Sequence, residues 1–323
     1  MDMLFVRFGF PKQRRRLYVL SISVAFHGVS IRPICAPSMR WLQLFEIFGF
    51  EVQVALAQPL DTVCGWHLVR LRFPPVFAGE VALVTGSASG IGQACVNSLR
   101  SRGCAVTGID LNSAEPAIDY LPIVGDLVDS EFVEDSIAKT VEAFGGLDEL
   151  VLNAGLFPRT QRLEELDDET WSKTMALNLD ANQRLLRLCH PFLKLSPIGG
   201  RVLVVGSKNV PAPGPGATAY SASKAAMTQV ARVAALEWGT DGIRVSVLHP
   251  NSVFDTNLWT SEILEKRAQA YVMTVEEYKR RSLLKTEVAS HDVAEAACEL
   301  CGPRFSKTTG TQVPIDGGEE RVV

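Results

Sequence analysis

The sequence predicts an α/β protein, a single domain with a doubly wound parallel sheet and an atypical N-terminal extension. From Val76 onward, short β-branched runs alternate with longer segments that have the composition of helices. This alternation is typical of parallel sheets covered by helices on both faces. A glycine-rich turn joins the first of these strands to the first helix, as expected at the start of such a sheet. Residues 1–75 show neither feature.

Composition limits the classes of function. The chain has 323 residues, of which 47% are hydrophobic, and this suits a packed globular domain. Its net charge of −4, with no long basic run in the body, gives no electrostatic case for nucleic acid. The seven cysteines are scattered and odd in number, so we expect no disulfide framework. The five histidines form no metal-ligand motif, and Cys298 and Cys301 are expected to pack on one helix face.

Residues 1–75 are predicted to lie outside the core. Arg14-Arg15-Arg16 precede an apolar run, 17–31, in a layout that loosely imitates a signal peptide. This run is too short and too polar to predict a membrane span, and we expect a cytoplasmic protein. Three interpretations stay open: a disordered or loosely packed extension, a targeting segment, or upstream sequence read from a start codon placed too early. A linker, Phe73-Pro74-Pro75, divides the chain into 1–75 and 76–323.

The elements of the core are expected in a regular order. Strands are predicted at 81–85, 105–109, 122–124, 149–152, 201–205, 243–248 and 312–315. Helices are predicted from the glycine-rich turn to about 102, at 130–144, 171–188 and 220–237, in a polar stretch that ends near 284, and at 291–300. Six or seven strands that alternate with helices indicate a sheet of the Rossmann type.

The glycine-rich turn, Thr85 to Gly92, has the spacing of a dinucleotide-binding loop. Gly86 permits the tight turn, Gly90 lets the backbone approach a pyrophosphate, and Gly92 permits close packing of helix on strand. The phosphates would meet the N–H groups at the start of the helix, around Ser89 and Ile91.

Asp110 ends the second strand and is placed to accept both ribose hydroxyls of an adenosine. Neither neighbouring turn, 87–89 or 111–113, contains an Arg or Lys to meet a 2′-phosphate. The pattern therefore favours NAD over NADP. The alternative is that Asp110 is only a turn residue.

Tyr220 and Lys224 share one face of an expected helix, since they stand four residues apart. Ser207 follows strand 201–205, and a Pro/Gly loop lets its hydroxyl approach the phenol. An ammonium about 5 Å away, at an effective dielectric of about 20, would favour phenolate by roughly 3 kcal/mol, or about two pKa units. Tyr220 would then exchange a proton with an alcohol or carbonyl while Ser207 holds its oxygen. A Tyr and a Lys on an ordinary amphipathic helix are the simpler interpretation of this motif alone.

Together these motifs resemble the short-chain dehydrogenase/reductase family, from about Gly79 to the end of the chain. They occur in the family's order along the sequence: Thr85-Gly with Gly90-Ile-Gly92, Asp126-Leu127, Asn153-Ala-Gly155, Asn178, Ser207, Tyr220-x-x-x-Lys224 and Asp316-Gly-Gly318. The coverage and the order make the resemblance specific.

The resemblance implies roles for residues that the spacing alone does not explain. Asp126, with Leu127 beside it, would contact the adenine. The run Asn153, Ala154 and Gly155 would support the sheet beside the cofactor. Asn178 would hold a water that links Lys224 to solvent as a proton relay, and the alternative is a hydrogen bond inside a helix.

The chain departs from the family pattern after the sixth strand. A Pro-Gly pair is usual there, whereas this chain has Pro250-Asn251, and Thr256 comes one place later than usual. Val253 would still meet the nicotinamide carboxamide through its backbone, next to the loop that Pro250 begins. The role of Thr256 stays open.

A narrower resemblance concerns the segments 206–209, 249–256 and 312–318. These are similar to the dehydrogenase halves of fused rhamnulose-phosphate aldolase and short-chain dehydrogenase proteins, which implies a small hydroxy-aldehyde or polyol substrate such as lactaldehyde. The implied activity is an NAD-dependent oxidoreductase with Asn178, Ser207, Tyr220 and Lys224 as catalytic residues. The alternatives are a dinucleotide-binding sensor without turnover and a scaffold anchored to a membrane through 17–57.

A stripe of small residues marks the helix at 220–237 as an expected subunit contact. Its alanines would let another helix approach closely, and they are Ala222, Ala225, Ala226, Ala231, Ala234 and Ala235. Relatives use this helix between subunits, so the resemblance implies a homodimer or homotetramer. The alternative is that these alanines pack inside one subunit.

Overall fold

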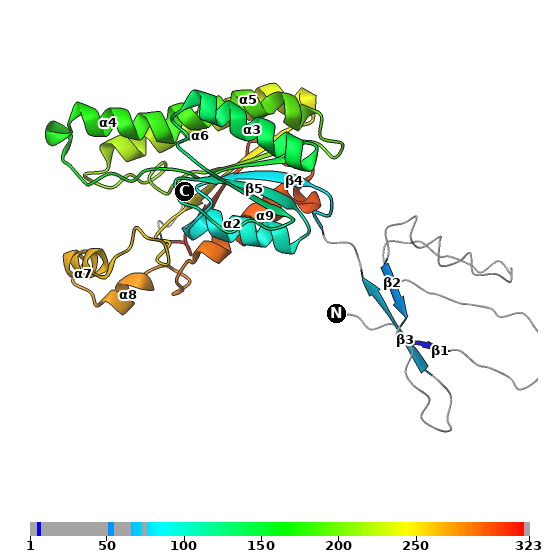
Figure 1. Ribbon diagram of the computed structural model, residues 1–323. Helices are drawn as coiled ribbons and strands as arrows, with labels where there is room; N and C mark the ends of the chain where they lie inside the picture. The colour runs from blue at the N-terminus through cyan, green and yellow to red at the C-terminus, as the bar shows by residue number, and fades with distance from the viewer. Residues whose placement is uncertain (1–4, 8–50, 55–65, 73–75, 320–323) are drawn as a thin grey trace, which may run out of the picture. The chain divides into compact units, whose positions relative to one another are not determined.

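The computed structural model describes residues 5–7, 51–54, 66–72 and 76–319 (Figure 1). The chain divides into two compact units, Met1–Pro75 and Val76–Val323. In the first unit, β1 (Phe5–Arg7), β2 (Glu51–Val54) and β3 (Trp66–Arg72) form an antiparallel sheet in the order β1-β3-β2. The apolar run 17–31 and the linker 73–75 lie outside the described residues. Among the helices described, none is both long and apolar enough to cross a membrane.

The second unit contains a seven-stranded parallel sheet in the order β10-β9-β8-β7-β4-β5-β6. Its strands are β4 (Val81–Thr85), β5 (Ala105–Asp110), β6 (Tyr120–Val124), β7 (Glu149–Leu152), β8 (Arg201–Val205), β9 (Arg244–Pro250) and β10 (Gln312–Ile315). This is the predicted doubly wound, Rossmann-type sheet. The third strand begins two residues earlier than predicted, and the sixth extends to Pro250.

Helices cover both faces of this sheet (Figure 1). One face carries α3 (Ser130–Phe144), α4 (Asp168–Met175), α5 (Asn182–Lys194) and α6 (Thr218–Trp238). The other carries α2 (Gly90–Ser101) and α9 (Ser290–Cys301), which pack against each other. Short 3-10 turns lie at Leu163–Glu165, Gly239–Asp241 and Pro303–Phe305.

The strands are buried on both faces, which explains their continuous apolar runs. On β4, Leu83 belongs to the core cluster under α3, α5 and α6, whereas Ala82 and Val84 belong to the cluster under α2 and α9. Cys298 and Cys301 of α9 are free, buried thiols in the second cluster, as predicted from the sequence. No group of three potential metal-ligating side chains occurs in the part of the chain that the structure describes.

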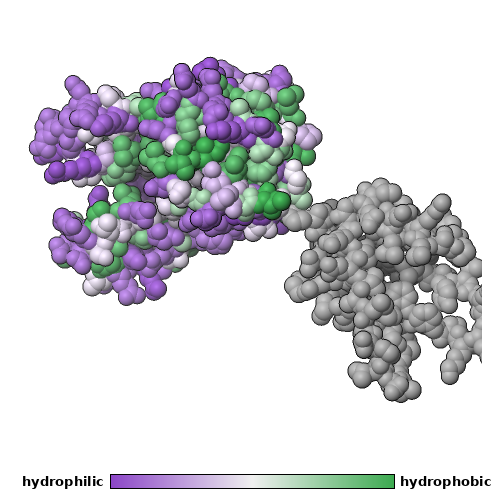
Figure 2. All heavy atoms as spheres, viewed as in Figure 1, coloured by the Kyte–Doolittle hydropathy of each residue, from purple (hydrophilic) through white to green (hydrophobic). Residues whose placement is uncertain are grey.

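Two stretches that were predicted to be helical are divided in the structure. The segment predicted at 171–188 is divided by a π-helical section, Ala176–Ala181, between α4 and α5. The polar stretch after β9 forms α7 (Ser261–Ala270) and α8 (Val275–Lys279), which enclose a small apolar cluster around Phe254 and Tyr278. Figure 2 shows a hollow in the surface between the region of α4 and the region of α7 and α8.

Candidate active site

The carboxyl ends of the parallel strands bring the predicted site residues to one edge of the sheet, where ligands bind in open α/β sheets. The turn after β4 comes first. Gly86 and Gly90 have φ values of +66° and +51°, and a Cβ on Gly92 would lie only 1.9 Å from the carbonyl oxygen of Gly86. Only glycine fits this packing. Ser89 precedes α2 as its N-cap residue, and its side chain makes no capping hydrogen bond. The start of α2, with Ile91 in its first turn, therefore suits a phosphate.

Asp110 joins this turn to the end of β5. Its Oδ2 accepts a hydrogen bond from the Ala88 N–H at 3.0 Å, and Oδ1 accepts from the backbone and side-chain amides of Asn112 at 2.9 and 3.1 Å. A carboxylate has about four acceptor positions. Asp110 therefore holds the turn, as in the alternative interpretation. Its carboxylate still has an acceptor position for a ribose hydroxyl.

Asp126 and Leu127 lie after β6. The exposed carboxylate of Asp126 accepts a hydrogen bond from the Val128 N–H at 2.9 Å. Leu127 is buried in the core cluster that includes Leu83 and Ile109. The side chain of Asp126 is therefore open to a ligand, whereas that of Leu127 supports the fold.

Asn153 ties the end of β7 to the turn after β4. Its Nδ2 donates to the carbonyl oxygens of Thr85 and Gly86 at 3.0 and 3.1 Å. The Thr85 hydroxyl oxygen accepts from the N–H groups of Asn153 and Ala154 at 3.0 and 3.1 Å. These bonds fix the position of the glycine-rich turn relative to the neighbouring strand.

Asn178 lies in the π-helical section and is almost fully buried. Its Oδ1 accepts from the Leu156 N–H at 2.7 Å, and its Nδ2 donates to the Leu156 carbonyl and the Ser223 hydroxyl at 2.9 and 3.0 Å. A Cβ on Gly155 would lie 3.3 Å from Asn178 Oδ1 and 3.4 Å from Lys224 Nζ. The two polar groups thus face the same glycine, and the relay through a water stays a prediction.

Ser207, Tyr220 and Lys224 come together at the ends of β8 and α6. The Ser207 side chain lies close enough to act on the Tyr220 hydroxyl, and Ser207 Oγ accepts from the Asn209 N–H at 3.1 Å. Lys224 Nζ lies 5.9 Å from the centroid of the Tyr220 ring and donates to the Val205 carbonyl at 2.7 Å. Tyr220 lies in the first turn of α6 and Lys224 one turn later.

The pKa of Tyr220 shifts in the direction opposite to the prediction. Burial raises the pKa of the phenol, and the hydrogen bond from Ser207 only partly opposes this effect. Burial also lowers the pKa of Lys224 to about 8. The predicted direction was wrong because desolvation of the buried phenol has the larger effect on its pKa.

The loop after β9 packs against the glycine-rich turn. The Pro250 carbonyl accepts from the Lys208 N–H at 3.1 Å, and Val253 is buried and pairs with Val288. Thr256 donates from its hydroxyl to the Val253 carbonyl at 2.9 Å, and its methyl group lies 3.1 Å from where a Cβ on Gly90 would be. The shift of Thr256 by one place still brings it to the turn.

Two residues that the sequence did not single out also belong to this region. The Phe157 ring packs on Tyr220, with centroids 4.6 Å apart and the planes tilted by 56°. Asp255 accepts from the Ser290 N–H at 2.9 Å and from the Ser290 hydroxyl at 2.9 Å, so it joins this loop to the start of α9. Phe157 lies outside the motifs, and Asp255 lies in the 249–256 run without a predicted role of its own, because no spacing in the sequence indicates such contacts.

The fold and this edge define a dinucleotide-binding protein of the doubly wound class. Residues 86–320 match a family model, adh_short_C2, described as enoyl-(acyl carrier protein) reductase. The chain belongs to the short-chain dehydrogenase/reductase family and is an oxidoreductase of that type.

Relatives of known sequence or structure agree with this assignment. The chain is 32% identical over 272 residues to the uncharacterized oxidoreductase YuxG of Bacillus subtilis, with 78% of this chain and 39% of that protein covered. The chain thus matches less than half the length of this curated relative. A short-chain dehydrogenase from Burkholderia cenocepacia in complex with NADP is 30% identical, with a TM-score of 0.67 over 76% of this chain and 99% of that one. The 3-ketoacyl-(acyl-carrier-protein) reductase from Brucella melitensis complexed with NADH is 26% identical, with a TM-score of 0.68 over 75% and 99%.

Proposed function

We propose that residues 76–323 form the catalytic domain of an NAD-dependent oxidoreductase that acts on a small alcohol or carbonyl compound. The observation that supports this most directly is the contact of Ser207 with Tyr220, next to a buried Lys224 that faces Gly155. Hydroxyl groups held together in this way suit proton exchange at a substrate oxygen. A sensor without turnover would not require this arrangement.

The glycine-rich turn fits a nicotinamide dinucleotide because its packing excludes side chains at Gly86 and Gly92. The amides at the start of α2 would hold the pyrophosphate, Asp110 the ribose and Asp126 the adenine. The backbone of the loop at Pro250 and Val253 would border the nicotinamide. The bound cofactor supplies or accepts the hydride. Asp110 would repel a 2′-phosphate, so we propose a preference for NAD.

In this proposal the protein's own residues hold and move one proton. Ser207 donates a hydrogen bond to the substrate oxygen, and Tyr220 gives or takes the proton at that oxygen. Lys224 favours the charged form of the phenol whenever Tyr220 loses its proton, and Asn178 keeps Lys224 connected to solvent. Phe157 covers one side of the phenol and limits the space for bulky substrates.

We propose a small hydroxy-aldehyde or polyol, such as lactaldehyde, as the substrate. The segments that resemble the dehydrogenase halves of fused aldolase–dehydrogenase proteins support this choice. We also propose that the protein acts in the cytoplasm.

A panel of substrates, followed at the absorbance of reduced nicotinamide, tests the proposal. We expect small hydroxy-carbonyl compounds to be turned over faster than steroids or acyl thioesters, and NAD to be used better than NADP. A panel in which acyl thioesters react fastest would contradict the substrate class. A panel with no turnover, despite binding of NADH, would favour a sensor.

We further propose a homodimer or homotetramer assembled through α5 and α6. Half of the predicted stripe packs inside the subunit, since Ala231, Ala234 and Ala235 are buried in the core. The support comes instead from a groove of about 680 Å³ between the two helices, which includes Ala226, Val230, Val233 and Trp238, and from Leu236, which is 82% exposed. Light scattering that gives a monomer at micromolar concentration would contradict this assembly.

A further inference from the structure

His249 lies on β9 beside the start of the loop that carries Ser207, and its side chain is only about 5% exposed. Its Nδ1 is 3.2 Å from the backbone nitrogen of Ser207, and its Nε2 is 3.0 Å from Oε1 of Gln312 on β10. The imidazole therefore joins the candidate active site to the edge strand of the sheet.

These two contacts require one protonation state. A backbone N–H can only donate, so Nδ1 must accept and carries no proton. The oxygen of the Gln312 amide can only accept, so Nε2 must carry the proton. The hydrogen bonds thus assign the neutral imidazole with its proton on Nε2.

The backbone around Ser207 explains why a side chain is needed here. On either side of it, the Gly206 N–H donates to the Leu248 carbonyl at 2.7 Å and the Lys208 N–H donates to the Pro250 carbonyl at 3.1 Å. The Ser207 N–H between them points to the imidazole instead. A Cβ on Gly206 would lie 2.6 Å from Nδ1, so glycine at this position makes room for the ring.

We infer that His249 is a positioning residue for Ser207. Its Nδ1 fixes the Ser207 backbone, and Gln312 fixes the ring. The hydroxyl of Ser207 is then held by Asn209 and against Tyr220. The inference rests on the proposed function, in which Ser207 holds the substrate oxygen, because a displacement of this hydroxyl of about 1 Å can cost roughly 10²-fold in rate.

Two substitutions separate this role from simple packing. An asparagine places its amide near the position of Nδ1, whereas a glutamine places it near Nε2. We expect His249→Asn to keep kcat with lactaldehyde and NADH within about threefold, and His249→Gln to lower it by about tenfold or more. A packing role predicts the reverse order, because glutamine is closer to histidine in size, and that order would overturn the inference. Both variants should bind NADH in calorimetry as the unaltered protein does.

A second measurement does not depend on turnover. Nitrogen-15 NMR of the full-length protein, with His249→Asn used to assign the signal, reports which ring nitrogen carries the proton. We expect the proton on Nε2 at neutral pH. A proton on Nδ1, or a charged imidazole, would overturn the inference even if lactaldehyde proved to be a substrate. If lactaldehyde is not turned over and the Nε2 proton is found, the substrate proposal fails and the assignment of His249 stands.

Discussion

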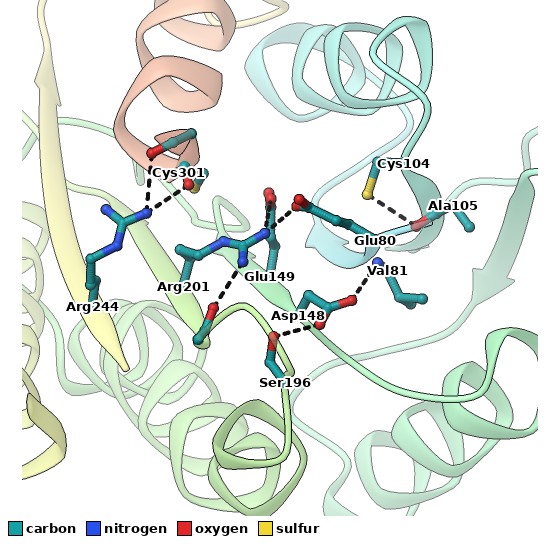
Figure 3. Close-up of polar contacts among 12 residues, drawn as sticks. Glu80, Val81, Cys104, Ala105, Asp148, Glu149, Ser196, Arg201, Arg244 and Cys301 are labelled. Carbon is teal, nitrogen blue, oxygen red and sulfur yellow. Dashed lines mark hydrogen bonds and ion pairs between the residues drawn. The ribbon is translucent and has the colours of Figure 1, made fainter. Parts of the chain in front are cut away.

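At the carboxyl edge of the sheet, the buried ammonium of Lys224 has a backbone carbonyl as its hydrogen-bond partner. At the amino edge, the buried guanidinium of Arg201 contacts the carboxyl groups of both Glu80 and Glu149 through Nη2 (Figure 3). Burial lowers the pKa of Lys224 to about 8. At the other edge, burial opposes the charge of Arg201, but the pKa of Arg201 is raised, chiefly by the carboxylate of Glu149.

The amino-edge cluster connects neighbouring strands. Glu149 and Arg201 are register partners on β7 and β8, and Glu80 precedes β4. Asp148 accepts from the Val81 N–H at 2.9 Å and from the Ser196 hydroxyl at 2.6 Å. Figure 3 shows these groups converging between the ends of the strands. A buried cation that is paired with a carboxylate therefore joins strands. A buried cation without such a partner has a pKa in the pH range where enzymes work, so that its charge can change there.

Arg201→Met should have the largest effect on stability. It leaves the fully buried carboxylate of Glu149 without its partner, and breaking such a pair costs about 3–5 kcal/mol. Denaturant unfolding at neutral pH measures this loss. Arg102→Met is the matched control, because the Arg102 pair with Glu295 is more exposed and should cost less than about 1 kcal/mol. Equal losses in the two variants would show that the amino-edge cluster has no special role.

Glu80 should make stability depend on pH. Burial and the hydrogen bond to Glu149 raise its pKa from 4.5 to about 8, although Arg201 opposes the shift. The folded state therefore holds a proton that the unfolded state releases. The resulting stability is fully present below about pH 4.5 and is lost as the pH rises through about 8, by at most about 1.4 kcal/mol per pH unit.

Glu80→Gln should flatten this dependence, which unfolding midpoints across neutral pH can follow. Glu295→Gln is its control, since Arg102 lowers the pKa of Glu295 and that group titrates in the acid range. A parallel pH dependence in the unaltered protein and in Glu80→Gln would show that another group is responsible.

Lys224→Met removes the buried cation at the carboxyl edge. Unlike Arg201→Met, it should not lower the free energy of unfolding at neutral pH. The folded-state pKa of Lys224 is depressed from 10.5 to about 8. The stability that its neutral amine contributes is therefore present above about pH 10.5 and is lost as the pH falls through about 8. At neutral pH the variant should be as stable as the unaltered protein, or more stable by about 1–2 kcal/mol, while turnover falls. A loss of stability similar to that of Arg201→Met would remove the contrast between the edges.

Asp110→Ser should have the smallest effect. Removing the carboxylate removes the repulsion of a 2′-phosphate, so the preference for NAD over NADP should narrow by about tenfold. Calorimetric titration of both cofactors measures the ratio. Since Asp110 also holds the glycine-rich turn through Ala88, NAD binding itself should weaken. An unaltered protein that prefers NADP would contradict the assignment.

The sequence predicted the carboxyl edge far better than the amino edge. The residues of the carboxyl edge belong to local motifs, such as the spaced glycines, Tyr220 with Lys224, and Asn153 with its neighbours. The members of such a motif are close together in the sequence, so the sequence alone can show them. Glu80, Glu149 and Arg201 stand at or just before the starts of three predicted strands. Only the strand order places them together, so a charged residue at the start of an apolar strand was the one available signal.

The structure brings the predicted site residues to one edge of the sheet, and their roles there stay a prediction, whereas the electrostatics of that edge differ from the prediction. The π-helical section around Asn178 was missed because its composition is that of an ordinary helix. The direction of the Tyr220 pKa shift was missed because desolvation depends on the packing around the phenol. The contacts of Phe157, Asp255 and His249 likewise arise from segments that meet only in the folded chain.

The proposal that Tyr220 exchanges the proton is tested most directly by single-turnover hydride transfer in Tyr220→Phe, followed at the absorbance of reduced nicotinamide. Phenylalanine keeps the ring against Phe157 and removes the hydroxyl that lies beside Ser207. We predict that the rate falls by at least about 10²-fold while NADH affinity changes little, and that Tyr271→Phe, at an exposed tyrosine of the α7–α8 region, keeps its rate. A near-normal rate in Tyr220→Phe would contradict the account.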